Sequence, residues 1–264
     1  MSTLDDDLAG VGLRLETSGP VATVTLARPE RRNAQSPAMW RALAAVRDRL
    51  GDDVRVVVLR GEGPSFSAGL DRAILQGGQV DGGPALLDLA ALPPAELDAA
   101  IVAFQEAFTW WRDGPAVSIA AVQGHAVGAG FQLALACDLR LCADDARFAM
   151  RETSLGLVPD LTGTAPLVEA VGYSRALEIC ATGRWVDAAE AHDLGLATAV
   201  VPRAELEAAT TDLVAALLGA PPGALLATKA LLRDAASRTP DRQRAAERAA
   251  QAGRLAAMLA ARDA

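Results

Sequence analysis

Two glycine-containing segments have the residue types needed to place backbone N–H groups beside one substrate oxygen. Residues 61–71 read GEGPSFSAGLD and residues 124–132 read GHAVGAGFQ, and each segment follows a strongly apolar run. Glycine permits close approach to the backbone, and turns that follow parallel strands meet beyond the carboxyl ends of a sheet. Two N–H groups aimed at one carbonyl oxygen form an oxyanion hole, which stabilises an enolate or a tetrahedral intermediate.

Two carboxylates lie in a segment that is otherwise largely apolar. Glu152 and Asp160 belong to MRETSLGLVPD, residues 150–160. A carboxylate in apolar surroundings has a raised pKa and can exchange protons near neutrality. The alternative is a structural pair that caps a helix or forms ion pairs. Gln132 ends the second glycine segment and is a third candidate, although an amide cannot take up a proton.

Other kinds of chemistry lack their motifs. The sequence has no GxSxG elbow, and GHAVGAG lacks the full GxGxxG spacing of a dinucleotide site. There is no CxxC, and His125 and His192 are far apart, so we expect no metal site.

Composition and charge bound the partners and the compartment. The net charge of −8 argues against a nucleic-acid partner. The acidic N-terminus lacks the pattern of a secretion signal, so we expect none, and we expect the apolar runs to be too short to span a membrane. The 3 cysteines are odd in number and lie in apolar runs. They are therefore expected to be free thiols in a reducing cytoplasm.

Strands alternate with helices in the first part of the chain, which predicts a largely parallel α/β sheet. Ser36-Pro37 is typical of a helix start, with Ser as the cap and Pro in the first position. After residue 160 the pattern becomes mainly helical. The strands are expected around residues 13–15, 21–26, 54–59, 117–122, 139–142 and 147–150, with a helix over residues 130–137.

Two regions are expected outside this alternation. Residues 76–94, QGGQVDGGPALLDLAALPP, are either a mobile lid over a pocket or a surface insertion. The predicted division of the chain is a core of residues 1–200 and a helical region of residues 201–264. The last helix has a narrow apolar stripe, as expected for packing on a neighbouring subunit or for closing its own pocket.

At this point the chain resembles the enoyl-CoA hydratase/isomerase (crotonase) family from about Leu13 to Ala235. The resemblance is carried, in order, by VATVTLARPERRNA, FSAGLD, VSIAAVQGHAVGAGFQLALACDLRLCADDARFAM, ETSLGLVPDLTGT and ATGRWVDAAEAHDLGLATAVV. It implies an α/β spiral of ββα units, with C-terminal helices that form trimers or dimers of trimers. It also implies an acyl-CoA thioester as the substrate, with coenzyme A as part of that substrate and no separate cofactor.

The resemblance also implies roles for individual residues. The peptide N–H groups of Ala68 and Ala129 are expected to hold the thioester oxygen. Further contacts with the substrate, including the adenine, the pantetheine and the phosphates of CoA, are expected from Arg28, Ser67, Gly69, Leu70, Asp71, Gly128 and Lys229.

The resemblance leaves the reaction open. Family hydratases use two glutamates, and here Glu152 matches one of them while Gln132 stands where the other would be. A single glutamate suffices to move a double bond, because it takes a proton from C2 and returns it to C4. We therefore expect an isomerase. The alternatives are a hydratase that works with one carboxylate and a protein that binds acyl-CoA without turnover. Asp160 either assists Glu152 or caps the helix that begins near residue 162.

Overall fold

The computed structural model describes residues 3–262. It contains the predicted, largely parallel sheet and a second, smaller sheet that the sequence does not predict. Only the first hairpin of the large sheet is antiparallel; its other pairs are parallel. The large sheet has 6 strands in the order β1 (Leu13–Ser18), β2 (Val21–Leu26), β3 (Val56–Gly61), β4 (Val117–Val122), β6 (Leu139–Ala143) and β9 (Ala199–Val201). The small sheet has 3 strands in the order β5 (His125–Val127), β7 (Arg147–Ala149) and β8 (Val186–Asp187).

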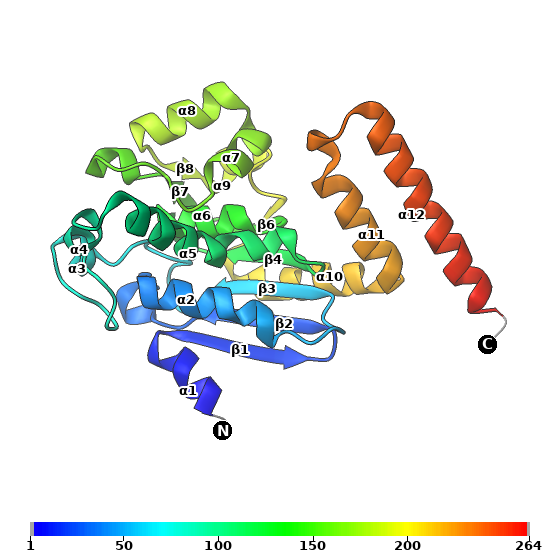
Figure 1. Cartoon of the computed structure of the whole chain (residues 1–264), viewed down its shortest axis with the longest axis horizontal. Helices are drawn as coiled ribbons and strands as arrows, with labels where there is room; N and C mark the ends of the chain where they lie inside the picture. Colours follow the sequence, from blue (N-terminus) through cyan, green and yellow to red (C-terminus); the bar gives the residue numbers. More distant parts are fainter. Residues whose placement is uncertain (1–2, 263–264) are drawn as a thin grey trace.

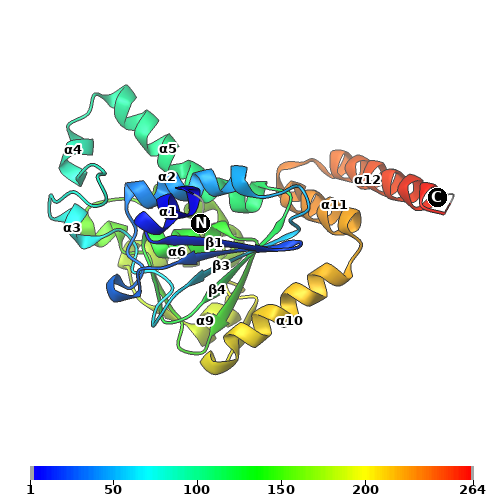
Figure 2. The same cartoon turned by 90° about the horizontal axis from the view of Figure 1, so that it is seen from below.

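Helices cover both faces of the large sheet (Figures 1 and 2). Side chains of successive strand residues point to opposite faces of a sheet. Because both faces are covered, nearly all side chains of β3 and β4 are buried. This explains the uninterrupted apolar runs in the sequence. The helices are α1 (Thr3–Gly10), α2 (Pro37–Val46), α3 (Arg72–Leu75), α4 (Leu86–Ala90), α5 (Pro94–Asp113), α6 (Ala129–Ala136), α7 (Thr164–Val171), α8 (Tyr173–Thr182), α9 (Ala188–Asp193), α10 (Leu206–Gly219), α11 (Pro222–Arg233) and α12 (Pro240–Ala260).

The two faces of the sheet have separate cores. Val57 and Leu59 of β3 join the larger core, which also contains buried side chains of α2, α5 and α6. Val56 and Val58 point the other way and pack with α10. The predicted start of α2 is confirmed: the Ser36 side chain accepts a hydrogen bond from the Met39 N–H, and Pro37 is the first helical residue.

The predicted boundary at residue 200 falls inside β9, the last strand of the large sheet. The next helix, α10, packs on that sheet and is therefore part of the core. The last helix, α12, stands beside α11 and away from the sheet (Figure 1). All elements after β9 are helices, so the chain within residues 3–262 is helical from Arg203 onward, while the division into two regions stays a prediction.

No single helix within residues 3–262 is both long and apolar enough to cross a membrane. Residues 203–219 and 222–237 have the length and hydropathy of a membrane span only as a pair, and the two segments meet at a bend of 103°.

Candidate active site

The two glycine segments lie side by side, as predicted. Ser67 forms a parallel bridge with Ala126 of β5, in which the Ser67 N–H donates to the His125 carbonyl at 2.9 Å. The Val127 N–H donates to the Ser67 carbonyl at 3.0 Å. These bonds join residues 66–71 to the strand that leads directly into α6, so the two turns form one site.

Gly69 is required where the two segments touch. Its φ is +80°, and a Cβ there would lie 2.3 Å from the Val127 carbonyl oxygen. The same position is 3.4 Å from the Ala129 nitrogen. A side chain at residue 69 would therefore strain the backbone and push the segments apart.

Ala129 is well placed to be an oxyanion donor. It is the first residue of α6, and the N–H of a first helical residue has no acceptor within its helix. Gly128, the cap, has φ of 51° and turns the chain from β5 into the helix. The positive end of the helix dipole adds to the attraction for a developing negative charge.

Ala68 does not offer a second donor in this structure. Its N–H donates to the Arg32 carbonyl at 2.8 Å. Leu70 is in a better position, because the Gly69 carbonyl accepts from the Gln35 N–H at 2.7 Å and the Asp71 N–H donates to the Gln35 carbonyl at 2.8 Å.

Leu70 is the bridging residue between these two bonds, so its own N–H points away from Gln35 and toward the side on which α6 begins. Sequence reasoning missed this donor. The sequence signal for this donor is Gly69. Its positive φ turns the chain, so the N–H groups of Ala68 and Leu70 point to different sides, whereas in a regular strand they would point to the same side.

Glu152 lies against the start of α6. Its Oε1 is 3.2 Å from the place where a Cβ on Gly128 would be, and it accepts a hydrogen bond of 2.7 Å from Gln132 Nε2. Its Oε2 is buried and has no hydrogen-bond partner. Burial raises the pKa of Glu152, and the charge of Asp160 adds to that effect, while the Gln132 hydrogen bond opposes it. One carboxylate oxygen is therefore free to exchange a proton.

Asp160 is near Glu152, and burial raises the pKa of Asp160 as well. It does not cap a helix, since α7 begins at Thr164 with Gly163 as its cap residue. The Asp160 carbonyl instead accepts a hydrogen bond of 2.7 Å from Gln105 Nε2 of α5. The helix-cap alternative is therefore wrong, and the alternative in which Asp160 assists Glu152 stays a prediction.

Ser67 and Asp71, which were expected at the substrate, use their side chains to shape the first glycine segment. Ser67 Oγ donates to the Asn33 carbonyl at 2.7 Å and accepts from Gln35 Nε2 and from the Gly69 N–H. Asp71 caps α3 through the Ala73 N–H and pairs with Arg31 at 2.8 Å.

Arg28 is paired within the chain. Its Nη1 lies 2.8 Å from Asp81 Oδ2, and Ser36 Oγ donates to that same oxygen at 2.8 Å. Val80 and Ala85 are buried, so this part of residues 76–94 is packed onto the start of α2. Asp81 thus neutralises the Arg28 guanidinium, and the predicted contact with a CoA phosphate stays a prediction.

Lys229 is buried away from the site. Its Nζ lies 2.8 Å from Asp138 Oδ2 and donates to the carbonyls of Ala116 at 2.6 Å and Trp111 at 3.2 Å. An ammonium has three donors, and all three are used. Burial lowers its pKa. The predicted contact of Lys229 with a CoA phosphate is therefore wrong, because its charge ties α11 to the body.

Lys229→Met should lower the free energy of unfolding by about 3 kcal/mol, because it leaves the Asp138 carboxylate and two carbonyls without their cation. Denaturant unfolding measures this loss. Arg41→Met is the control, since Arg41 is exposed on α2, and its effect should be within about 0.5 kcal/mol. The Michaelis constant for an acyl-CoA should not change in the folded Lys229→Met protein. A weaker affinity with unchanged stability would contradict the structural role.

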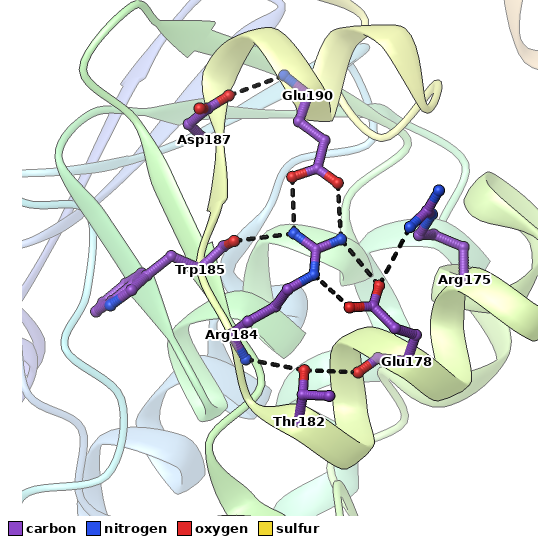
Figure 3. Close-up of polar contacts among 7 residues, drawn as sticks. All are labelled: Arg175, Glu178, Thr182, Arg184, Trp185, Asp187 and Glu190. Carbon is purple, nitrogen blue, oxygen red and sulfur yellow. Dashed lines mark hydrogen bonds and ion pairs between the residues drawn. The ribbon is translucent and has the colours of Figure 1, made fainter.

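An arginine cluster joins α8 to α9 (Figure 3). Arg184 forms a bidentate pair with Glu190 of α9, with both bonds at 2.7 Å, and also binds Glu178 of α8. The next residue, Trp185, lies under the Arg151 guanidinium at 5.2 Å. The cluster thus fixes β8, α8 and α9 around the residue that precedes Glu152.

Two cavities lie elsewhere in the molecule. One of about 580 Å³ lies between part of α10 and the large sheet, and one of about 440 Å³ lies beside Lys229. Neither is lined by Glu152, Leu70 or Ala129. Residues 3–262 contain no group of three or more His, Cys, Asp or Glu side chains that could hold a metal ion. Within the same range the cysteines are free; Cys137 and Cys142 are buried, and Cys180 is partly buried.

Comparisons with known proteins identify the family of the chain. The profile of the enoyl-CoA hydratase/isomerase family matches residues 16–256. EchA17 of Mycobacterium tuberculosis, which is named as an enoyl-CoA hydratase, is 36% identical over 86% of this chain and 82% of its own length. A hydroxycinnamoyl-CoA hydratase-lyase of Pseudomonas fluorescens is 33% identical over 82% of this chain and 76% of its own length.

Solved structures give the same result. A protein of Thermobifida fusca YX, described as an enoyl-CoA hydratase in complex with acetoacetyl-CoA, is 52% identical with a TM-score of 0.92 and covers 96% of this chain and 98% of its own. A complex of a Thermobifida fusca protein with CoA has a TM-score of 0.91 at 51% identity, with 97% of both chains covered. The mixed α/β fold and the adjoining glycine segments are thus those of an acyl-CoA enzyme, and the chain belongs to the enoyl-CoA hydratase/isomerase family.

Proposed function

We propose that this enzyme moves the double bond of a 3-enoyl-CoA to the 2,3 position. Glu152 acts as the base and the acid, and the N–H groups of Ala129 and Leu70 hold the thioester oxygen. The observation that carries the proposal is the buried Glu152 Oε2, which has no partner and belongs to a carboxyl group lying against the start of α6.

The proposed reaction needs one proton-carrying oxygen. Glu152 Oε2 takes a proton from C2, and the electron pair of the C–H bond moves into a dienolate whose charge rests largely on the thioester oxygen. Two backbone N–H groups stabilise that charge. The same oxygen then returns the proton to C4. A pKa raised by burial suits a group that must both accept and release a proton.

Acyl-CoA as the substrate class is supported by the Thermobifida fusca proteins, whose structures hold CoA and acetoacetyl-CoA. In this proposal CoA is part of the substrate and the reaction needs no separate cofactor. The three free thiols suit the reducing cytoplasm that we propose as its location.

A hydratase is the second candidate, and two observations favour it. The named relatives include enoyl-CoA hydratases, and Asp160 is a second carboxylate near Glu152. In that reaction Asp160 would orient the water, while Glu152 would transfer the proton. Gln132 cannot act as the second base, because an amide does not take up a proton at neutral pH.

The test compares a 3-enoyl-CoA and a 2-enoyl-CoA by the absorbance of the conjugated thioester. The proposal predicts a rise with the first substrate that is lost in Glu152→Gln and kept in Glu205→Gln, a control at an exposed glutamate in the turn before α10. A fall with the second substrate that is faster than this rise would contradict the isomerase and support the hydratase. Binding of both esters without turnover would contradict both reactions.

We also propose that α11 and α12 join the subunits into a trimer or a dimer of trimers. These helices expose four large apolar side chains, which an interface between subunits would cover: Leu232, Leu255, Met258 and Leu259. Light scattering should give three or six times the chain mass of 27.3 kDa. A monomer at micromolar concentration would contradict this assembly.

A further inference from the structure

The amide of Gln132 is buried, and its hydrogen bonds join it to Glu152 and to a nearby turn of the backbone. Only 1% of the residue is exposed. Its Oε1 accepts hydrogen bonds from the N–H of Leu161 at 2.9 Å and from the N–H of Gly163 at 3.2 Å, and its Nε2 donates to Glu152 Oε1 at 2.7 Å. The amide oxygen is thus occupied on the side away from Glu152.

The two backbone donors belong to a strained turn. Thr162, between them, has φ of +66°, a conformation that is rare for a β-branched residue. Consecutive N–H groups around such a residue form a concave site that favours an oxygen with negative character. The Gln132 oxygen fills that site, which compensates part of the strain at Thr162.

This turn determines which way the Gln132 amide points. In the reversed orientation the amide NH₂ would face two N–H donors, and the amide oxygen would face a carboxylate oxygen. Both contacts would be repulsive, so the donor side must face Glu152. Gly163 makes the approach possible, because a Cβ there would lie 2.6 Å from the Cγ of Gln132.

The result is an asymmetric carboxyl group. Glu152 Oε1 is held by the amide, while Oε2 is buried with no partner. Both acceptor positions of Gln132 Oε1 are filled by backbone N–H groups, and one of the two N–H donors of Nε2 is held by Glu152.

We propose that Gln132 is a positioning residue: the turn at residues 161–163 orients its amide, and the amide holds Glu152 Oε1 so that Oε2 alone exchanges protons with the substrate. This inference rests on the proposed function, in which Glu152 is the acid and base. It differs from a direct role for Gln132, since the amide acts only through Glu152.

Two substitutions separate positioning from a purely structural role. Gln132→Glu keeps an oxygen for the two N–H donors but replaces the NH₂ donor with an acceptor beside Glu152 Oε1. Gln132→Met removes both. The amide hydrogen bond lowers the pKa of Glu152, so its loss should raise that pKa, and a neighbouring charge should raise it further.

The experiment measures isomerisation of a 3-enoyl-CoA as a function of pH in the full-length protein. Both variants should lose about 10- to 100-fold in kcat, with the Michaelis constant within about threefold of wild type. The acidic limb of the kcat profile should move to higher pH, because more alkaline conditions are needed to ionise Glu152. Gln132→Glu should keep the wild-type melting temperature more closely than Gln132→Met, because it preserves the turn.

Three outcomes distinguish this inference from the proposed function. If Glu152→Gln is inactive and Gln132→Glu folds with a wild-type kcat and pH profile, the positioning role is wrong and the proposed function stands. If Glu152→Gln turns over normally, the proposed function itself is wrong. If kcat falls in Gln132→Glu with an unshifted pH profile, the positioning role is also wrong, because Gln132 then acts in another way than by holding Glu152. If Gln132→Met does not fold, Gln132→Glu alone decides.

Discussion

Glu152→Gln should reduce isomerase turnover by about 10²- to 10⁴-fold while the CoA ester still binds. The amide has the size of the carboxyl group, and its oxygen can keep the hydrogen bond from Gln132 Nε2. What it cannot do is take the C2 proton. The loss should therefore appear in kcat, with little change in the Michaelis constant.

The same variant should be more stable than wild type at neutral pH. Burial raises the pKa of Glu152 in the folded protein, so ionisation of this group disfavours the folded state above the unfolded pKa of about 4.3. The contribution of Glu152 to the free energy of unfolding is therefore fully present below the unfolded pKa. It is lost as the pH rises through the higher pKa of the folded protein. The amide in Glu152→Gln carries no charge, so the advantage of this variant should grow with pH and vanish near pH 4.

Thermal unfolding of wild type, Glu152→Gln and Glu205→Gln across pH measures this difference. Glu205 is exposed, so its variant should follow wild type. A Glu152→Gln protein that is inactive and also less stable at neutral pH would indicate a damaged fold, and the kinetic loss would then not support an acid–base role.

Gly69→Ala should lower kcat by about 10²- to 10³-fold, which is the usual effect of losing one oxyanion donor. The φ of Gly69 is +80°, and the added Cβ would lie 2.3 Å from the Val127 carbonyl oxygen. Because that oxygen belongs to the backbone of β5, the segment carrying Leu70 must move. The Leu70 N–H would then no longer point at the same place as the Ala129 N–H.

Gly19→Ala is the matched control for backbone strain. Gly19 also has a positive φ, of 52°, but a Cβ there meets nothing within 4 Å. Both variants should be less stable, since alanine disfavours positive φ. Only Gly69→Ala should lose turnover. Equal activities for the two variants would show that the position of Leu70 does not matter for catalysis.

The sequence predicts the elements of this fold better than its contacts. Val-rich runs and the Ser36-Pro37 start identify β3, β4 and α2, because burial on both faces and helix capping leave local signals. The sequence does not reveal β9, since this strand has only 3 residues and its pairing with β6 is not visible locally.

The candidate site could be predicted in outline but not in its contacts. Glu152 follows from its apolar surroundings, whereas Ala129 follows from the family resemblance. The Leu70 donor depends on a single backbone angle at Gly69, and the Gln132 amide is oriented by a turn that is distant in the sequence, as its bonds to residues 161 and 163 show. Lys229 looks like a free cation in the sequence, because its partner Asp138 is distant along the chain.

The most direct test of the central claim follows one hydrogen atom. A 3-enoyl-CoA deuterated at C2 is converted in ordinary water under single-turnover conditions, and the product is analysed for deuterium at C4. Because Glu152 Oε2 is buried, the account predicts that a substantial part of the label moves from C2 to C4. A product that carries only solvent hydrogen at C4 would contradict this account, in which one buried oxygen carries the hydrogen from C2 to C4.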